Sequence, residues 1–235
     1  VHESGSERAG SLNFSCACAG ILAASLAWGQ RPTIIKKCKE LMQLMDYAPH
    51  DFVMQAEDQD YERFCNFKHR TFNSYDCVYF LKSLANIYRH HGGLETVFTR
   101  AYQKHQDMFE VLKEWYSVFT SLPAEARVLR HIANVEKGSA AKRVNMFLRW
   151  MVRHDGEVDF GLWKEIPTSA LLIPLDLHTG NVSRQLGLLT RNQNDRKAVE
   201  ELTARLREMD PVDPIRYDFS LFGLGAFEKY NRSNF

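Results

Sequence analysis

Apolar residues recur every three or four positions along most of the chain, which is the spacing of a helix that buries one face. The clearest case is 139–153, where Val144, Phe147, Leu148 and Met151 fall on one side. No run of alternating apolar and polar residues is long enough to predict a sheet, so the pattern predicts an all-α fold. The predicted helices are 21–28, 32–45, 49–53, 74–91, 94–102, 107–119, 139–153, 176–187, 196–208 and 213–224.

Residues that favour helix ends support these boundaries. Asn73 or Ser74 can cap the helix 74–91, and Gly92-Gly93 follows it, as expected for a helix that stops there. The polar stretch 57–73 is expected to be irregular. Residues 168–175 lie between prolines and are expected to form an extended connector.

Length and composition set the class of protein. A chain of 235 residues forms one large domain or two small ones. Its 45% hydrophobic and 25% charged residues exclude a disordered tail, a collagen-like fibre and a disulfide-stapled miniprotein. With 30 basic against 29 acidic residues the net charge is only +1, so an anionic partner must be held by a local patch.

Cysteine usage and the first residues point to the cytoplasm. The five cysteines are an odd number without zinc spacing, and we expect them to be buried, reduced thiols. The longest apolar run, 21–28, is shorter than the roughly 20 residues that span a bilayer. A mixed polar start argues against a signal peptide, and a chain that begins at Val1 rather than Met is consistent with a missing initial segment.

A turn of small residues, 138–142 (GSAAK), leads directly into the helix 139–153. Small residues let the backbone approach a partner closely, and a helix start attracts phosphate. Lys142, Arg149 and Arg153 fall on one face of this helix, away from the apolar stripe. The alternative interpretation is an ordinary solvated face. The surrounding basic residues are Arg127, Arg130, Lys137, Lys142, Arg143, Arg149 and Arg153.

Two further positions have both a structural and a chemical interpretation. Asp176 precedes a predicted helix, where an aspartate usually caps the first N–H groups, and a capping carboxylate also stays ionised and rigid enough for catalysis. Gln30 lies in the tight turn 28–32 and either reaches into a neighbouring surface or is a plain loop residue.

Several common catalytic motifs are missing from the sequence. The nine histidines are scattered, so a metal site is not expected. There is no phosphate-binding Gly-x-x-x-x-Gly-Lys loop, no Gly-x-Gly-x-x-Gly and no Gly-x-Ser-x-Gly. Nucleotide hydrolysis, Rossmann-type redox chemistry and α/β-hydrolase chemistry therefore lose their usual support.

Taken in chain order, these elements resemble the helix-hairpin-helix DNA glycosylases, the group of endonuclease III and 8-oxoguanine glycosylase. Residues 138–145 (GSAAKRVN) match the first glycine and the lysine of that group's hairpin. Residues 175–182 (LDLHTGNV) match the aspartate and histidine of its Val-Asp-x-His-x-x-Arg motif. Helix 21–28 with Gln30, and residues 218–225, are similar to its glutamine segment and closing helix. A bacterial family placed beside these glycosylases, without an assigned activity, is closer still.

The resemblance implies a base-excision glycosylase, with or without strand cleavage, that acts on double-stranded DNA. It implies that Lys142 attacks the sugar C1′, that Asp176 assists, and that Gln30 fills the gap left by an extruded base. The hairpin departs from the group's pattern because Ala140 replaces its second glycine. The residues implied to contact DNA are Gly138, Ser139, Ala140, Arg143, Arg149, Arg153, Gln30 and His178.

The resemblance also implies an architecture of two helical subdomains with a cleft between them. The larger is expected over 20–158 and contains the hairpin, and the smaller combines 1–19 with 159–235. We expect a monomer without a cofactor, and no iron–sulfur cluster because no cysteine follows Cys77. Two alternatives stay open: a non-catalytic DNA- or RNA-binding module of the same fold, and a scaffold for protein interactions.

Overall fold

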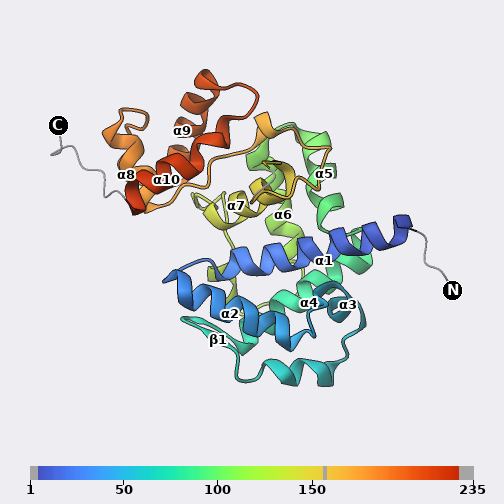
Figure 1. Cartoon of the computed structure of the whole chain (residues 1–235). Coiled ribbons are helices and arrows are strands. Elements are labelled where there is room, and N and C mark those ends of the chain that lie inside the picture. Colours follow the sequence, from blue (N-terminus) through green and yellow to red (C-terminus); the bar gives the residue numbers. More distant parts are fainter. Residues whose placement is uncertain (1–4, 156–157, 228–235) are drawn as a thin grey trace. The chain divides into compact units, whose positions relative to one another are not determined.

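The computed structural model describes residues 5–155 and 158–227, and the all-α prediction is confirmed over this part of the chain (Figure 1). The only β-sheet among the described residues is one short two-stranded hairpin. The first helix reaches much further back than the predicted 21–28, to Gly5. The α-helices are α1 (Gly5–Leu26), α2 (Arg31–Leu44), α3 (Pro49–Gln55), α4 (Ser74–His90), α5 (Leu94–His105), α6 (Met108–Phe119), α7 (Lys142–Val152), α8 (Leu177–Gln185), α9 (Arg196–Met209) and α10 (Asp218–Ala226).

The chain divides into two compact units. Unit 1 comprises Val1–Lys104 and Glu114–Ile132, and unit 2 comprises His105–Lys113 and Ala133–Phe235. The predicted boundary at 158 differs from this division, because α7 groups with the C-terminal elements: Arg149 of α7 binds Asp218 of α10, and Phe147 packs edge-on against Trp163. The predicted cleft stays a prediction.

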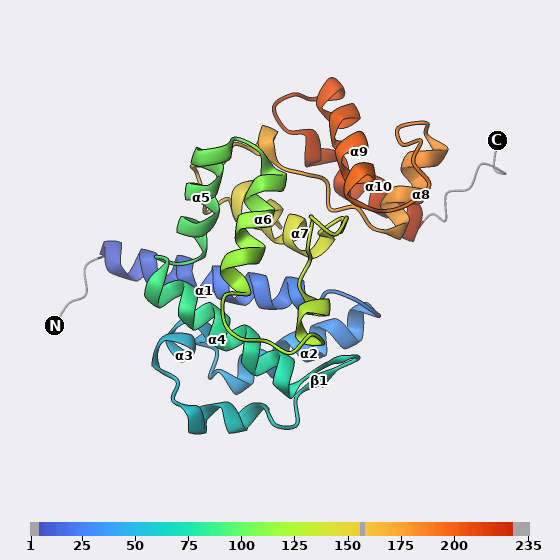
Figure 2. The ribbon, with the colours of Figure 1, turned by 180° about the vertical axis from the view of Figure 1, so that it is seen from behind.

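The helix α4 in unit 1 begins where the sequence predicted. The side chain of Asn73 accepts hydrogen bonds from the N–H groups of Tyr75 and Asp76, and the Asp76 carboxylate accepts one from the Asn73 N–H. Cys77, Leu81 and other apolar residues on one face of α4 are buried. Figures 1 and 2 show α3 beside α4, and the two helices contact each other.

The stretch 57–73 is not irregular, which corrects the prediction. It forms a 3-10 helix, η1 (Asp58–Phe64), and an antiparallel hairpin of β1 (Lys68–His69) and β2 (Phe72–Asn73). Three phenylalanines, Phe64, Phe67 and Phe72, are buried and fix this segment to the core. The sequence did not predict these elements, because three buried phenylalanines in a polar segment are too few to give a regular spacing of apolar residues.

Helices α8 and α10 of unit 2 lie side by side (Figures 1 and 2). Gly225 permits this contact, because an added Cβ atom would lie only 3.0 Å from both Cβ and the main-chain oxygen of His178. The connector before α8 begins with a turn of 3-10 helix, η3 (Thr168–Ala170), and continues as a buried extended stretch over 171–175. The prediction of an extended connector is therefore confirmed for 171–175 and wrong for 168–170. Another such turn, η4 (Pro214–Tyr217), precedes α10, and η2 (Val128–His131) lies in unit 1.

All five cysteines are free thiols. Cys18 and Cys77 are buried as predicted, and burial raises the pKa of Cys18 to about 12. Cys65 is exposed, so the prediction of buried thiols is wrong there. Within the described residues, no helix has the length and apolar character needed to cross a membrane.

Candidate functional site

The turn before α7 is held in shape by its own backbone. Gly138 and Ala141 both have positive φ angles, of 83° and 48°. Ala141 precedes α7 in the left-handed region, which explains why the helix begins at Lys142 rather than at the predicted 139. The N–H of Arg196 donates to the Gly138 carbonyl at 2.9 Å, which fixes the turn to the start of α9.

Most N–H groups of this turn already have acceptors. Those of Gly138 and Ser139 donate to main-chain carbonyls, and that of Ala141 donates to the Ser139 hydroxyl at 3.1 Å. The predicted phosphate contact through the N–H groups of Gly138 and Ser139 is therefore wrong. Among the described residues, the N–H groups of Ala140 and Lys142 have no acceptor, so they are the donors that the turn can offer.

The Lys142 side chain is half-buried in the first turn of α7. Its amine contacts the Met146 sulfur at 3.5 Å. No carboxylate of the described residues lies within 4.0 Å of Lys142 Nζ, so the amine is not held in an ion pair there. An amine in this state has its hydrogen-bonding capacity available to a ligand.

Asp176 caps α8, as predicted. Its Oδ1 accepts a hydrogen bond from the Thr179 N–H at 3.0 Å, and its other carboxylate oxygen has no hydrogen-bond partner among the described residues. The Asn194 amide donates to the Asp176 main-chain oxygen at 2.9 Å. Gly180 leaves room for this contact, because an added Cβ would meet Asn194 Oδ1 at 2.6 Å.

A second carboxylate, Asp218, links the two predicted residues. It is the first residue of α10, is buried, and accepts a hydrogen bond from Arg149 Nη1 at 2.6 Å. Burial raises the pKa of Asp218 to about 6, the charges of Arg149 and Lys142 oppose this rise, and the Asp176 charge adds to it. Lys142 and Asp176 are therefore both within electrostatic reach of one buried carboxyl. We call Lys142, Asp176 and Asp218 the acid–lysine cluster.

Arg149 does not lie on an exposed basic face, which corrects the prediction. The residue is only 1% exposed. Its guanidinium binds one oxygen of Asp159 through Nε and Nη2, both at 3.1 Å, and also binds Asp218. The Phe219 ring lies over it, with its centroid 3.7 Å from Cζ. A guanidinium that is enclosed in this way is not available to a DNA phosphate.

Arg153 is also occupied by carboxylates. Its Nε donates to Asp213 at 2.9 Å, and its Nη1 contacts Asp155 at 3.0 Å and Asp159 at 2.7 Å. The interpretation of Arg153 as a DNA contact on a basic face is therefore wrong. Aspartates from outside α7 neutralise this side of the helix: Asp155 and Asp159 follow it in the chain, and the tertiary structure brings Asp213 there.

The remaining candidates lie in different surroundings. Arg143 is half-buried, and burial lowers its pKa. His178 is exposed beside the Phe222 ring, with ring centroids 5.7 Å apart. Gln30 is exposed and precedes α2 in unit 1, whereas the other predicted site residues belong to unit 2. Arg127, part of the predicted basic surroundings, binds Asp76 at 3.0 Å and so supports the start of α4.

Sequence reasoning assigned no role to Asp159 or Asp218. The sequence held only a weak sign of a role for Asp218, which is the single acid in an otherwise apolar helix. An acid at the start of a helix is usually explained by its favourable interaction with the helix dipole. Its burial against Arg149 depends on residues far apart in the chain. Within the described residues, no group of three or more histidine, cysteine or acidic side chains is arranged to hold a metal ion.

Comparison with known proteins gives a family but no activity. No curated protein and no solved structure matches the chain. One family model, described as "Protein of unknown function (DUF2400)", matches residues 13–227, which include the acid–lysine cluster and the turn before it. The match covers most of the 235 residues, and the chain therefore belongs to the DUF2400 family.

Proposed function

We propose that the protein is a DNA base-excision glycosylase whose nucleophile is Lys142. One arrangement carries the proposal: Arg149 ties the helix that Lys142 begins to Asp218 of α10, and α10 packs against α8, which Asp176 caps. Neither Lys142 nor Asp176 is used up in an ion pair among the described residues. An amine that is free of an ion pair, in the electrostatic field of carboxylates, is suited to attack on a sugar carbon that becomes positive.

The proposed chemistry needs no cofactor. The Lys142 ammonium first gives up one proton, which the departing base later takes. The free amine then gives its lone pair to C1′ of the nucleotide, and the bond between C1′ and the base breaks. The base leaves with that electron pair and takes up a proton. The C1′–O4′ bond then breaks and the nitrogen forms a double bond to C1′. One proton passes from the nitrogen to O4′, and a protonated Schiff base results. The carboxylates of Asp176 and Asp218 stabilise the positive charge on the sugar, because their negative charges are already in place.

Binding of DNA requires that the damaged base leave the stack, at a cost of a few kcal/mol. The N–H groups of Ala140 and Lys142 contact a phosphate at the start of α7, where the helix dipole is favourable. Arg149 and Arg153 take no part in DNA contacts, since carboxylates already hold them.

Borohydride trapping tests this proposal directly, because reduction turns a Schiff base into a stable link between protein and DNA. The full chain is mixed with duplexes that carry 8-oxoguanine, uracil or an abasic site, and the adducts are separated on denaturing gels. We expect an adduct with the wild-type chain and none with Lys142→Gln. Lys137→Gln is the matched control, because Lys137 is an exposed lysine just before the same turn. It should trap as the wild type does.

Two results contradict the catalytic role. One is the absence of an adduct with every duplex, and the other is equal trapping by Lys142→Gln and the wild type. Asp176→Asn should bind duplex DNA as the wild type does while yielding at least about tenfold less adduct, since the group that stabilises the charged sugar is lost.

A non-catalytic DNA-binding module is the second candidate. The open N–H groups of Ala140 and Lys142 favour it, because they suit a phosphate whether or not the lysine reacts. This candidate predicts salt-dependent duplex binding without an adduct on any lesion. If no duplex binds even at low salt, both nucleic-acid functions are wrong and a protein-interaction scaffold is favoured.

A further inference from the structure

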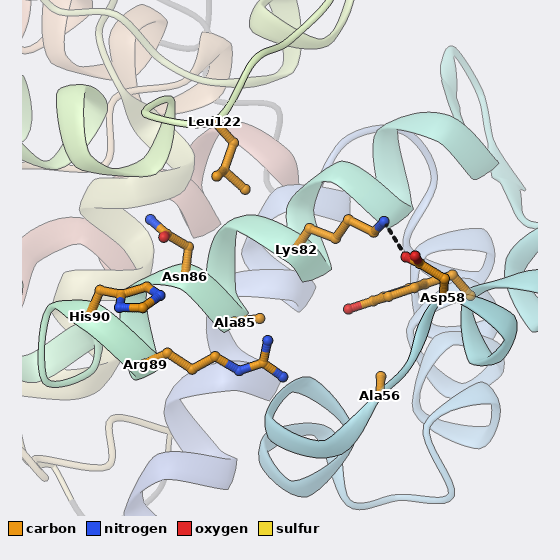
Figure 3. A pocket seen from close by; sticks show the side chains of 9 residues that line it. Ala56, Asp58, Lys82, Ala85, Asn86, Arg89, His90 and Leu122 are labelled. Atoms are coloured by element: carbon orange, nitrogen blue, oxygen red, sulfur yellow. Dashed lines mark hydrogen bonds and ion pairs between the residues drawn. The ribbon is translucent and has the colours of Figure 1, made fainter.

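Unit 1 contains a pocket that shares no residue with the acid–lysine cluster. Its volume is about 290 Å³, close to the lower end of the range for small-molecule sites (Figure 3). The walls are the last two turns of α4, the residue after α3, the helix η1 and a leucine of the loop after α6. The lining residues are Ala56, Asp58, Tyr61, Lys82, Ala85, Asn86, Arg89, His90 and Leu122.

One face of α4 supplies most of the pocket. Lys82, Asn86 and Arg89 follow one another at intervals of three or four residues, so they project from the same side of the helix. Figure 3 shows Lys82 and Arg89 extending in the same direction from α4, toward Asp58 and Ala56. The pocket thus presents charged groups beside apolar ones, which include the buried Ala85 and the half-buried Leu122.

Among the residues that line the pocket, the charge balance is positive. Lys82 and Arg89 face one carboxylate, Asp58, which lies 2.8 Å from Lys82 Nζ. Arg89 donates from Nη2 to the Met54 carbonyl at 2.7 Å, and its other nitrogens have no partner among the described residues. The C-terminal end of α4 contributes about half a negative charge, which is less than the full charge that Arg89 carries.

The side chain of Tyr61 lies near both cations, Lys82 and Arg89. Its pKa is raised by burial and, to a lesser extent, by the charges of Asp58 and Asp60, and the charges of Lys82 and Arg89 oppose that rise. The Lys82 ammonium lies over the Tyr61 ring, 4.9 Å from its centroid. Both cations are therefore close to the phenol, and a ligand in the pocket would meet them together.

Several polar groups of the pocket have unused hydrogen-bonding capacity. The Asn86 amide nitrogen donates to Ser121 at 3.2 Å, but its oxygen has no partner among the described residues. The Tyr61 hydroxyl and the His90 ring likewise have no hydrogen-bond partner there. A few convergent polar groups next to apolar surface are what orients a small ligand in a pocket.

From this arrangement we infer that the pocket binds a small organic anion. Its phosphate or carboxylate group pairs with the guanidinium of Arg89, and its apolar body covers Ala85 and Leu122. The Asn86 and Tyr61 polar groups then receive the remaining hydrogen bonds of the ligand. Phosphate and carboxylate each present a pair of oxygens that an arginine can bind through two N–H groups, so the head group is decided by experiment.

Amide chemical-shift titration of the full chain tests the inference, with phenyl phosphate, benzoate, inorganic phosphate and benzylamine as probes. Phenyl phosphate should bind with a millimolar or lower Kd and shift the amides of Arg89 and Asn86. It should bind at least about tenfold more tightly than inorganic phosphate, because its ring buries apolar surface. The stronger of phenyl phosphate and benzoate identifies the head group. Equal binding of benzylamine, or shifts confined to other residues, overturns the proposal.

Substitutions in the pocket supply the second part of the test. Asn86→Asp keeps the side-chain shape but adds a negative charge, and we expect it to weaken phenyl phosphate binding at least about tenfold. Arg89→Lys keeps the charge but loses the forked donors, and we expect a smaller loss. Lys39→Ala is the matched control, since Lys39 is an exposed cation of unit 1 outside the pocket. Unchanged affinity in Asn86→Asp overturns the proposal.

Discussion

The buried carboxyl of Asp218 makes the stability of the protein depend on pH. The ordinary pKa of an aspartate is 3.8, and burial raises the pKa of Asp218 to about 6 in the folded chain. Below about pH 4 both the folded and the unfolded chain keep this proton, so Asp218 contributes no pH dependence. Between about pH 4 and pH 6 the unfolded chain loses the proton first, and the free energy of unfolding falls. The difference of about two pKa units corresponds to about 3 kcal/mol, lost in full above about pH 7.

Asp218→Asn isolates this effect, because an amide cannot ionise. We expect the free energy of unfolding of the wild type, minus that of the variant, to fall by about 3 kcal/mol between pH 4 and pH 7. Urea unfolding at steps of half a pH unit measures the difference. The hydrogen bond from Arg149 changes in the variant at every pH, so only the slope is used.

Asp195→Asn is the matched control for this experiment. Asp195 caps α9 and binds Arg191, and this hydrogen bond lowers the pKa of Asp195 to about 2. Its contribution to stability is therefore lost only as the pH falls below about 4, and the difference between wild type and Asp195→Asn should be flat from pH 4 to pH 7. A flat difference for Asp218→Asn over the same range would refute the reasoning.

Three further substitutions, one of them with a control, test contacts within the individual units. Arg149→Ala should lower the free energy of unfolding by about 3–5 kcal/mol, because it leaves two buried carboxylates without their cation; a loss below 1 kcal/mol in urea unfolding would contradict this. Gly225→Ala should cost about 1–3 kcal/mol through its clash with His178, whereas Gly223→Ala, with no atom within 4 Å, should raise stability by up to about 1 kcal/mol. Equal effects of the two glycine changes on thermal unfolding would count against the close α8–α10 contact. Asn73→Ala should lower stability by about 1–2 kcal/mol, since it removes the cap of α4, and a neutral result would show that the cap is dispensable.

The helices and their capped starts could be predicted from the sequence because the interactions that form them are local. The Asn73 cap serves N–H groups two and three residues further on, and the Asp176 cap serves one three residues further on. The apolar stripe of α7 is likewise a matter of spacing, and Val144, Phe147 and Leu148 are buried as predicted. Caps and apolar stripes depend on which residue types lie a few positions apart, so they can be predicted before the fold is known.

The surroundings of the charged residues on α7 were decided by the tertiary structure. Spacing alone placed Lys142, Arg149 and Arg153 on one polar face, but it gave no sign that aspartates outside the helix, some nearby and some far along the chain, lie against the two arginines. The partners of Arg149 and Arg153 come from the connector after α7 and from α10 and the turn before it. Burial and electrostatic pairing depend on which segments meet in space, and periodicity within one helix contains no information about its neighbours. The sequence therefore determined that α7 forms and which side is apolar, while the fold determined that Lys142, and neither arginine, keeps its charge free of a carboxylate partner among the described residues.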